Sequence, residues 1–234
     1  MAYVFPPRNQ PSIPIHGSDL RFPVRRIYCV GQNYAAHARE MGSDPQREPP
    51  FFFTKPADAI VPVPGSGENL IEIAYPPRTA KLHHEIELVA AIGVSGRNIS
   101  PGQAAAHVFG FAVGVDLTRR DLQEQAKASR RPWDTSKGFD ASAPISRLHA
   151  IKDCGWLDSG RVWLDVNGQR RQDGNLSELT WSVSEVIAEL STYFELQAGD
   201  LVFTGTPSGV GELKPRDVLE GGVDGLDTIK VRVE

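Results

Sequence analysis

The sequence predicts an α+β fold in which a mixed β-sheet curls into a roll or sandwich and carries a few short helices. Runs of β-branched and aromatic residues outnumber the segments with helical periodicity. The two kinds of segment do not alternate, as the strand–helix–strand units of a parallel sheet would require. The 234 residues show no internal repeat, and they are enough to bury the core of one large domain.

Strands are expected where short apolar or β-branched runs are bounded by glycine, proline or asparagine. The run at 51–53 lies between prolines and is expected to be buried. The Asn167-Gly168 pair favours a tight hairpin turn after the run that precedes it. The expected strands are 26–30, 86–92, 109–115, 162–166 and a final set between 201 and 233.

The clearest helix begins at Ser182, because Glu185 follows at the spacing of a capping box. Apolar residues then recur at helical spacing up to position 194, and Gly199 is expected to end the segment. Residues 118–128 are also expected to be helical.

Two shorter helices are indicated by their end signals. Asn33 has the character of an N-cap for a helix over 34–41, and Gly42 lies at the position where glycine commonly ends a helix. Ser100 followed by Pro101 favours the start of a second short helix, with Gln103 at the capping-box position.

The first 24 residues are rich in proline and predict an extended N-terminal arm. Proline lacks the backbone N–H that a central strand or a helix interior needs. Residues 25–234 show no composition break typical of a linker, so we expect a single catalytic domain after the arm.

The charge and composition exclude several classes of protein. Twenty-five Lys and Arg residues against 29 Asp and Glu leave a net charge of −4, which argues against a nucleic-acid partner. No apolar run approaches the ~18 residues of a membrane span, and the start has no signal-peptide pattern. The two cysteines cannot build a disulfide framework. We therefore expect a soluble cytoplasmic protein.

Three carboxylates form a candidate metal site. Glu85 and Glu87 are two apart in a predicted strand, so their side chains share a face, and Asp116 ends a second apolar run. Mg²⁺ or Mn²⁺ would satisfy such oxygen ligands. A solvated strand face and an ordinary strand-end aspartate are the plainer interpretations. His83-x-Glu85 lacks the following P-C-x-x-C of a zinc deaminase, which excludes that zinc motif.

A second group of residues could supply acid–base chemistry. His37 and Glu40 are three apart in a predicted helix, where the carboxylate could orient the imidazole as a general base. Lys137 is expected in a polar loop, and the glycine-rich segment 204–211 could approach a small anion but has no P-loop lysine. A surface ion pair, a surface lysine and a simple turn remain the alternatives.

These weak signals occur together in motifs spread over nearly the whole chain, in a fixed order. The motifs are VGQNYAAH (30–37), FTKP (53–56), HEIEL (84–88), DLTRRDLQ (116–123), KGFD (137–140), and GDL (199–201) with TGTP (204–207). From about Arg26 to Val233 the chain therefore resembles the fumarylacetoacetate hydrolase family.

The resemblance implies a β-roll, a homodimer and a set of site residues. Mg²⁺ or Mn²⁺ would be held by Glu85, Glu87 and Asp116. A His37–Glu40 dyad would lie on a lid that orders over the substrate, with Lys137 beside the metal site. The residues expected to contact substrate are Arg120, Gln123 and Thr206; the family often has alanine where this chain has Arg119, so the arginine role is assigned to Arg120.

The short length and the N-terminal arm resemble bacterial fumarylpyruvate hydrolases and acylpyruvases of gentisate breakdown. The implied reaction is the metal-dependent hydrolysis of a C–C bond in an acylpyruvate, with fumarylpyruvate and water giving fumarate and pyruvate. One alternative is an oxaloacetate decarboxylase, or a related isomerase-decarboxylase or tautomerase, that uses the same metal and enolate chemistry. A second alternative is a non-catalytic protein that binds small dicarboxylates through the metal.

Overall fold

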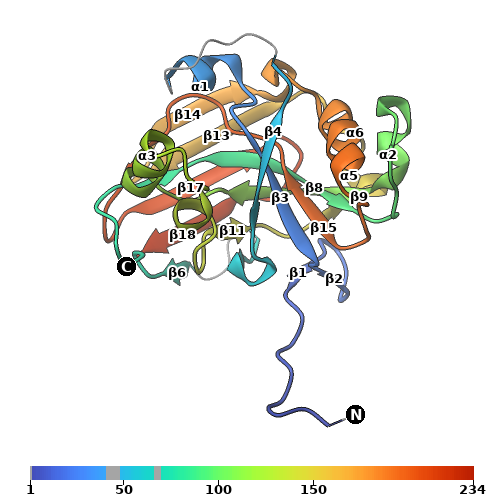
Figure 1. Ribbon diagram of the computed structural model, residues 1–234, viewed down its shortest axis with the longest axis horizontal. Helices are drawn as coiled ribbons and strands as arrows, with labels where there is room; N and C mark the ends of the chain where they lie inside the picture. The colour runs from blue at the N-terminus through green and yellow to red at the C-terminus, as the bar shows by residue number, and fades with distance from the viewer. Residues whose placement is uncertain (1, 41–47, 66–69) are drawn as a thin grey trace.

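The structure is a computed structural model that describes residues 2–40, 48–65 and 70–234. Its two largest sheets contain eight and five strands, and its helices are short (Figure 1). This arrangement confirms the predicted α+β class with a mixed, curled sheet. No helix among the described residues combines the length and the apolar character needed to cross a bilayer.

The eight-stranded sheet follows the order β4-β3-β15-β8-β9-β11-β5, with β12 paired to β9. It is mixed, because β15 is parallel to β3 and antiparallel to β8. Its strands are β3 (Arg26–Gly31), β4 (Phe51–Lys55), β5 (Ile60–Pro62), β8 (Ile86–Ile92), β9 (Val108–Val115), β11 (Ala143–Ile145), β12 (His149–Ala150) and β15 (Asp200–Phe203).

The five-stranded sheet follows the order β14-β13-β17-β18-β6, and two smaller sheets complete the described strands. The Asn167-Gly168 turn joins β13 to β14 with both residues at positive φ (52° and 75°), which confirms the predicted hairpin. The strands of the five-stranded sheet are β6 (Ile71–Ile73), β13 (Arg161–Val166), β14 (Gln169–Asn175), β17 (Val218–Val223) and β18 (Ile229–Val233). A three-stranded sheet contains β7 (Leu82–His84), β10 (Thr118–Arg119) and β16 (Gly211–Leu213). A two-stranded sheet contains β1 (Ser12–Pro14) and β2 (Arg21–Pro23).

The helices are mostly one to three turns long. They are α1 (Ala35–Glu40), α2 (Ala104–His107), α3 (Arg120–Ala128), α4 (Asp134–Lys137), α5 (Ile151–Cys154) and α6 (Val183–Tyr193). The Ser182–Glu185 capping box at the start of α6 is confirmed, since each side chain bonds the other residue's backbone N–H. The helix ends at Tyr193, however, well before Gly199, because the chain turns to extended backbone at Phe194.

Two capping predictions at short helices were wrong. The Asn33 amide does not cap α1: it donates to the Thr204 and Trp181 carbonyls and accepts from the Trp181 N–H, so it joins two distant loops. Ser100 bonds the side chain of Gln103 and makes no backbone cap, and the segment begins as a 3₁₀ turn before α2. Gly42 lies outside the described residues.

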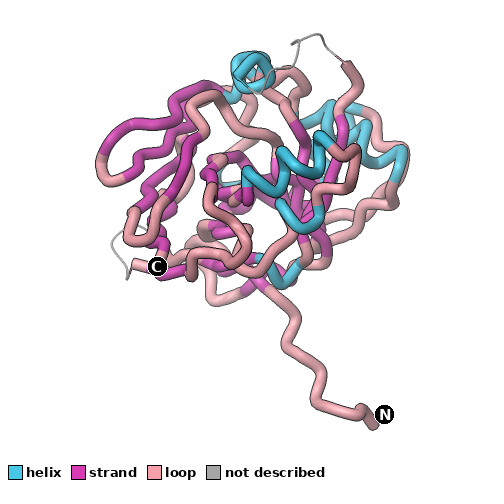
Figure 2. Tube along the Cα trace, turned by 60° about the vertical axis from the view of Figure 1, so that its left-hand side comes forward, coloured by secondary structure: helices cyan, strands magenta, loops and turns pink. Residues whose placement is uncertain are grey.

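The proline-rich N-terminal segment divides into two parts. Residues 2–9 extend away from the body in both views, whereas the Pro11 carbonyl accepts the Val24 N–H (Figures 1 and 2). Residues 12–24 contain the β1–β2 hairpin, and its Ile13 is fully buried against the domain. Proline therefore excludes this segment from a central strand but not from an edge hairpin.

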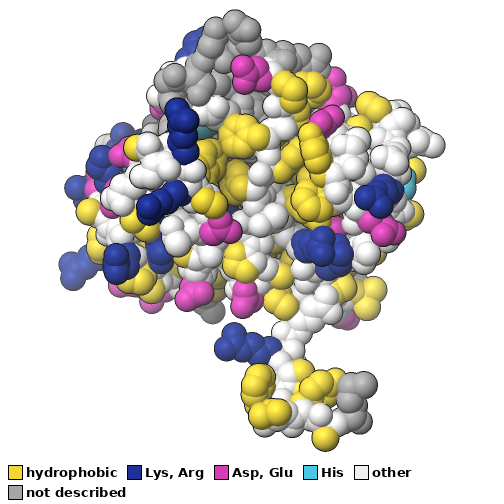
Figure 3. Space-filling model, viewed as in Figure 1, with side chains coloured by type: hydrophobic (Ala, Val, Ile, Leu, Met, Phe, Trp, Pro, Cys, Tyr) yellow, Lys and Arg dark blue, Asp and Glu magenta, His cyan; other side chains and the backbone are white. Residues whose placement is uncertain are grey.

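The prediction that 51–53 is a buried run was wrong. β4 is an edge strand of the eight-stranded sheet, and Phe51 is 41% exposed. Tyr193 at the end of α6 contacts Phe52 and is itself exposed. Hydrophobic side chains gather over this part of the surface (Figure 3). An apolar run between prolines cannot by itself distinguish an edge strand from a central one.

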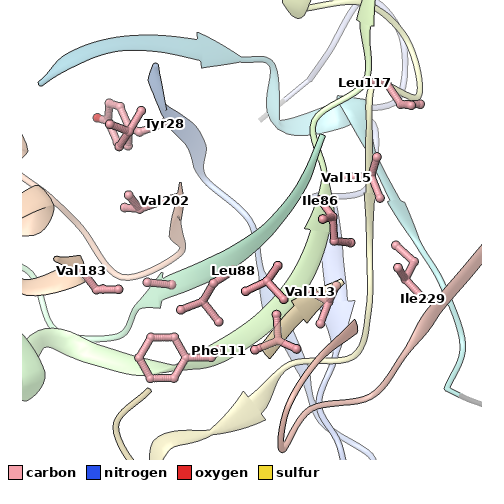
Figure 4. Close-up of a cluster of buried hydrophobic side chains, with 14 of the residues drawn as sticks. Tyr28, Ile86, Leu88, Phe111, Val113, Val115, Leu117, Val183, Val202 and Ile229 are labelled. Carbon is pink, nitrogen blue, oxygen red and sulfur yellow. The ribbon is translucent and has the colours of Figure 1, made fainter. Parts of the chain in front are cut away.

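β8 divides the hydrophobic core, because its alternate side chains enter different clusters. Ile86 and Leu88 belong to the larger cluster, together with Val113 of β9 (Figure 4). Val89 and Ala91 belong to the second cluster on the opposite face. Both faces of β8 are therefore covered, which explains its nearly continuous apolar sequence.

Candidate active site

One pocket collects most of the residues singled out from the sequence. It is lined by His37, Glu85, Glu87, Arg120, Gln123, Lys137 and Thr206. These side chains come from α1, the start of β8, α3, α4 and the loop after β15. The two remaining candidates are attached to it, since Asp116 belongs to the carboxylate cluster and Glu40 bonds His37.

Strand register brings the three carboxylates together. β8 and β9 are antiparallel neighbours, with Glu87 opposite Gly114, so the end of β9 lies beside the start of β8. The Asp116 N–H donates to the Glu85 carbonyl over 2.8 Å. One oxygen from each of Glu85, Glu87 and Asp116 lies within 4.8 Å of the others, and all three residues are buried. They do not form a solvated strand face.

Two of the carboxylates are paired with buried cations. Lys137 Nζ lies 2.7 Å from both Glu85 Oε2 and Asp116 Oδ2, and Arg120 Nη2 lies 2.5 Å from Glu85 Oε1. Burial would raise the pKa of Glu85, but Lys137 and Arg120 outweigh it and lower that pKa. Burial likewise opposes the charge of Lys137, yet Asp116 and Glu85 raise its pKa. Both groups are therefore charged at neutral pH.

Glu87 is the least compensated member of the cluster. Its Oε2 accepts the Gly205 N–H over 2.7 Å, and no salt bridge joins it to any described residue. Burial, with Asp116 and Glu85 nearby, raises the pKa of Glu87 well above its usual range. Asp116 Oδ1 also makes no hydrogen bond within the described part of the chain, although Lys55 Nζ is 2.8 Å away. These oxygens fit a hard divalent cation.

His37 and Glu40 form a pair at one wall of the pocket. His37 Nδ1 lies 3.3 Å from Glu40 Oε2, and the Gly209 N–H donates to the same carboxylate. The hydrogen bond with His37 lowers the pKa of Glu40. Because Nδ1 is engaged with the carboxylate, the other ring nitrogen of the buried His37 is left for the pocket that this residue lines.

The structure distinguishes the two neighbouring arginines. Arg120 is buried and donates to Gln123 Oε1 as well as to Glu85. Arg119 lies over the ring of Phe139, 4.4 Å from its centroid, and does not line the pocket. The backbone turns from β10 into α3 between these two residues, so adjacent side chains point in different directions.

Thr206 and Lys137 are held by their own local structure. Thr206 Oγ1 donates to the Ile86 carbonyl and accepts from Gln172 Nε2, which fixes the loop after β15 against β8. Lys137 is at the end of helix α4 and not in a loop, which corrects the sequence-based expectation. Its position there directs the amine into the pocket between Glu85 and Asp116.

Sequence reasoning missed three residues of this region. Lys55 is fully buried, lies 2.8 Å from Asp116 Oδ1, and donates to the Leu117 and Lys137 carbonyls. Lys127 and Trp133 also line the pocket. The available signal for Lys55 was its place inside the FTKP motif, where a lysine ends an otherwise apolar strand.

Comparison with known proteins places the chain among enzymes of one family. A crystal structure of fumarylpyruvate hydrolase from Pseudomonas aeruginosa, in complex with Mn²⁺ and pyruvate, is 52% identical, covers 99% of each chain and superposes with a TM-score of 0.97. A fumarylpyruvate hydrolase from Ralstonia is 42% identical over 81% of this chain and 95% of its own length. A mitochondrial oxaloacetate decarboxylase from Dictyostelium discoideum is 42% identical over 87% of this chain and 91% of its own length.

The family model for the fumarylacetoacetate (FAA) hydrolase C-terminal region matches residues 26–234. This range includes all the carboxylates, cations and the His37–Glu40 pair described above. The protein therefore belongs to the fumarylacetoacetate hydrolase family.

Proposed function

We propose that the protein hydrolyses a C–C bond in acylpyruvates and that fumarylpyruvate is its substrate, with fumarate and pyruvate as products. The observation that carries the proposal is the buried Glu85–Glu87–Asp116 cluster in one site with the His37–Glu40 pair. The fumarylpyruvate hydrolases of Pseudomonas aeruginosa and Ralstonia, at 52% and 42% identity, support this substrate.

The carboxylate cluster would hold Mg²⁺ or Mn²⁺. Its oxygen donors suit either ion, and the related Pseudomonas aeruginosa structure contains Mn²⁺. When bound, the ion supplies Lewis-acid polarisation of the 2-oxo acid and stabilises negative charge that develops on it.

His37 would act as the general base. A water molecule beside the distal carbonyl of the 1,3-dicarbonyl unit loses a proton to His37, and its oxygen attacks that carbonyl. Glu40 keeps the imidazole in the required orientation through the bond at Nδ1 and stabilises the imidazolium. The C–C bond then breaks, the acyl half leaves as a carboxylate, and the pyruvate half leaves as its enolate and is protonated.

The cationic residues would bind the substrate and stabilise its developing charge. Lys137 lies between two carboxylates at the inner end of the pocket. Its ammonium would face the oxygens of the departing pyruvate unit there. Arg120, Gln123 and Thr206 line the same space and would orient the substrate through hydrogen bonds.

Oxaloacetate decarboxylation is a second candidate because the Dictyostelium relative with that activity is 42% identical. Decarboxylation needs enolate stabilisation but no attacking water, so it does not require the His37–Glu40 pair. A protein that only binds dicarboxylates does not require a base either. The buried and oriented imidazole therefore favours hydrolysis over both alternatives.

The test follows the loss of fumarylpyruvate absorbance in EDTA, after Mg²⁺ is restored, and in parallel with oxaloacetate. We expect metal-dependent loss with fumarate and pyruvate as products. His37→Ala should lower turnover by about 10²- to 10⁴-fold, and Mg²⁺ should still raise its melting temperature. Normal turnover in that variant contradicts the base assignment. If fumarylpyruvate is not consumed but oxaloacetate releases pyruvate, at a rate that His37→Ala does not change, the result supports the decarboxylase.

We also propose that the enzyme is a cytoplasmic homodimer that serves aromatic-compound catabolism. The exposed aromatic side chains at the β4 edge, which include Phe51 and Tyr193, support a surface that a second copy covers (Figure 3). Size-exclusion chromatography with light scattering, on wild-type protein and on a Phe51→Ser variant, tests this assembly. A wild-type protein that elutes with the mass of one chain at micromolar concentration contradicts the homodimer.

A further inference from the structure

Helix α3 presents a row of three polar side chains to the pocket. Arg120, Gln123 and Lys127 are separated by three and four residues, so they lie along one helical face, and all three line the pocket. Arg120 is buried beside Glu85 at the inner end, whereas Lys127 is exposed. A rise of 1.5 Å per residue separates their backbones by about 10 Å. The row therefore runs from the carboxylate cluster to the mouth of the pocket.

The surroundings of Lys127 differ from those of the inner cations. Its Nζ lies 5.2 Å from the ring centroid of Trp133, and no salt bridge joins it to a described residue. Trp133 packs in turn against Phe53 and Phe51, at centroid distances of 5.8 and 5.4 Å. The outer pocket thus combines an aromatic wall with a cation that forms no salt bridge to a described carboxylate.

Charges of both signs lie near Lys127, since Glu85 and Glu124 oppose the effect of its cationic neighbours on its pKa. Partial burial and the neighbouring Arg120 lower the pKa of Lys127. At the inner end, Lys137 and Arg120 are already paired with Glu85. An anion arriving at the mouth would find Lys127 without a salt-bridge partner among the described residues.

We infer that Lys127 and Trp133 form an outer subsite that binds the terminal carboxylate of the acyl group, and so select acylpyruvates with a planar, unsaturated acyl chain that ends in a carboxylate. The inference rests on the proposed function, which directs the 2-oxo acid end toward the carboxylate cluster. A conjugated acyl chain is flat and stacks on the Trp133 ring. Its terminal carboxylate then reaches Lys127, one helical turn beyond Gln123.

Lys127 is a specificity-determining residue in this inference and takes no part in bond cleavage. An acylpyruvate with a neutral acyl group, such as acetylpyruvate, leaves the ammonium without a partner. Oxaloacetate is too short to extend from the carboxylate cluster to the mouth. The subsite should therefore act on long dianionic substrates alone.

The experiment compares fumarylpyruvate with acetylpyruvate in wild-type protein and in Lys127→Met. The loss of one charge-assisted hydrogen bond at a partly exposed site should lower kcat/KM for fumarylpyruvate by about 10- to 100-fold, mainly through KM. The value for acetylpyruvate should stay within about twofold, because that substrate makes no such bond. Lys127→Arg, which keeps the charge, should recover most of the loss.

Lys81→Met is the matched control. Lys81 lies outside α3, pairs with Glu124 of that helix at 3.8 Å, and does not line the pocket. Its replacement by methionine therefore removes one positive charge near α3 without changing the pocket lining. Lys81→Met should leave the ratio of the kcat/KM values for fumarylpyruvate and acetylpyruvate unchanged. Equal losses on both substrates in Lys127→Met, or the same change of ratio in Lys81→Met, overturn the inference.

A binding measurement separates this inference from the proposed reaction. Calorimetry in Mg²⁺ on His37→Ala protein, with and without Lys127→Met, gives the affinities of the two acylpyruvates in the absence of hydrolysis. A preference for fumarylpyruvate that disappears when Lys127→Met is added supports the subsite, and if the wild-type protein does not hydrolyse fumarylpyruvate, only the proposed reaction is refuted. Equal affinities of the two compounds for His37→Ala protein overturn the subsite, even if the wild-type protein hydrolyses both.

Discussion

Replacement of Glu87 by glutamine should stabilise the metal-free protein, although it removes a residue of the candidate metal site. Glu87 is 2% exposed, and its carboxylate lies beside those of Glu85 and Asp116 without a cationic partner among the described residues. Glutamine keeps the size of the side chain and can still accept the Gly205 N–H. It removes the negative charge that the other two carboxylates oppose.

The pKa shift sets the sign and the size of the effect. The pKa of Glu87 is raised in the folded protein, so above the unfolded value of 4.5 the folded state binds more protons than the unfolded state. Stability is therefore lost as pH rises from 4.5 toward the folded pKa. At pH 7 the loss has an upper limit of about 3 kcal/mol, because each pKa unit corresponds to ~1.4 kcal/mol.

Urea unfolding in EDTA at pH 5, 6 and 7 measures this prediction. We expect Glu87→Gln to exceed the wild-type free energy of unfolding by about 1 to 3 kcal/mol at pH 7, and by less at pH 5. In Mg²⁺ at about 100 times its Kd, the wild-type protein should gain about 3 kcal/mol, and the variant should gain less. In Mg²⁺ the free energies of unfolding of wild-type and Glu87→Gln protein should therefore become nearly equal, or the wild-type value should become the larger.

Glu85→Gln is the matched control with the opposite sign. Glu85 is paired with Lys137 and Arg120, and its loss leaves buried cations without a partner. The expected destabilisation is about 3 kcal/mol or more. A Glu87→Gln protein that is less stable than wild type in EDTA, or whose advantage does not grow with pH, refutes the reasoning.

Two further predictions concern a buried lysine of the site and the two cysteines. Lys55→Met should destabilise the metal-free protein by about 3 to 5 kcal/mol in urea unfolding, because Lys55 Nζ is a buried partner of Asp116; a loss below 1 kcal/mol contradicts this. Ellman's reagent should modify Cys154 slowly in the native protein and spare Cys29, because burial raises the pKa of the fully buried Cys29 thiol. Both thiols should react after denaturation, and two fast thiols in the native protein contradict the packing around β3.

Local patterns predicted much of the secondary structure. The apolar runs of β8 and β9, the capping box of α6 and the Asn-Gly hairpin each depend on interactions over a few residues. The alternation of side chains along a strand also placed Glu85 and Glu87 on the same face. Their meeting with Asp116 was anticipated from strand ends, yet its distances depend on the β8–β9 register.

Other features depend on partners far along the chain. Asn33 resembled an N-cap, but Trp181 and Thr204 offer it three hydrogen bonds that a helix end could not supply. The burial of Phe51 was predicted wrongly because the order of strands, and not local composition, places β4 at the edge.

The sequence by itself predicted candidate residues for the chemistry and many of the short segments that become strands or helices, because these predictions follow from residue type and nearby spacing. Only the tertiary structure decided which cation pairs with which carboxylate. Lys55, Lys137 and Arg120 come from three separate elements and meet Glu85 and Asp116 through strand register and helix position. Electrostatic pairing in a buried site is set by distance in space, which local sequence rules do not contain.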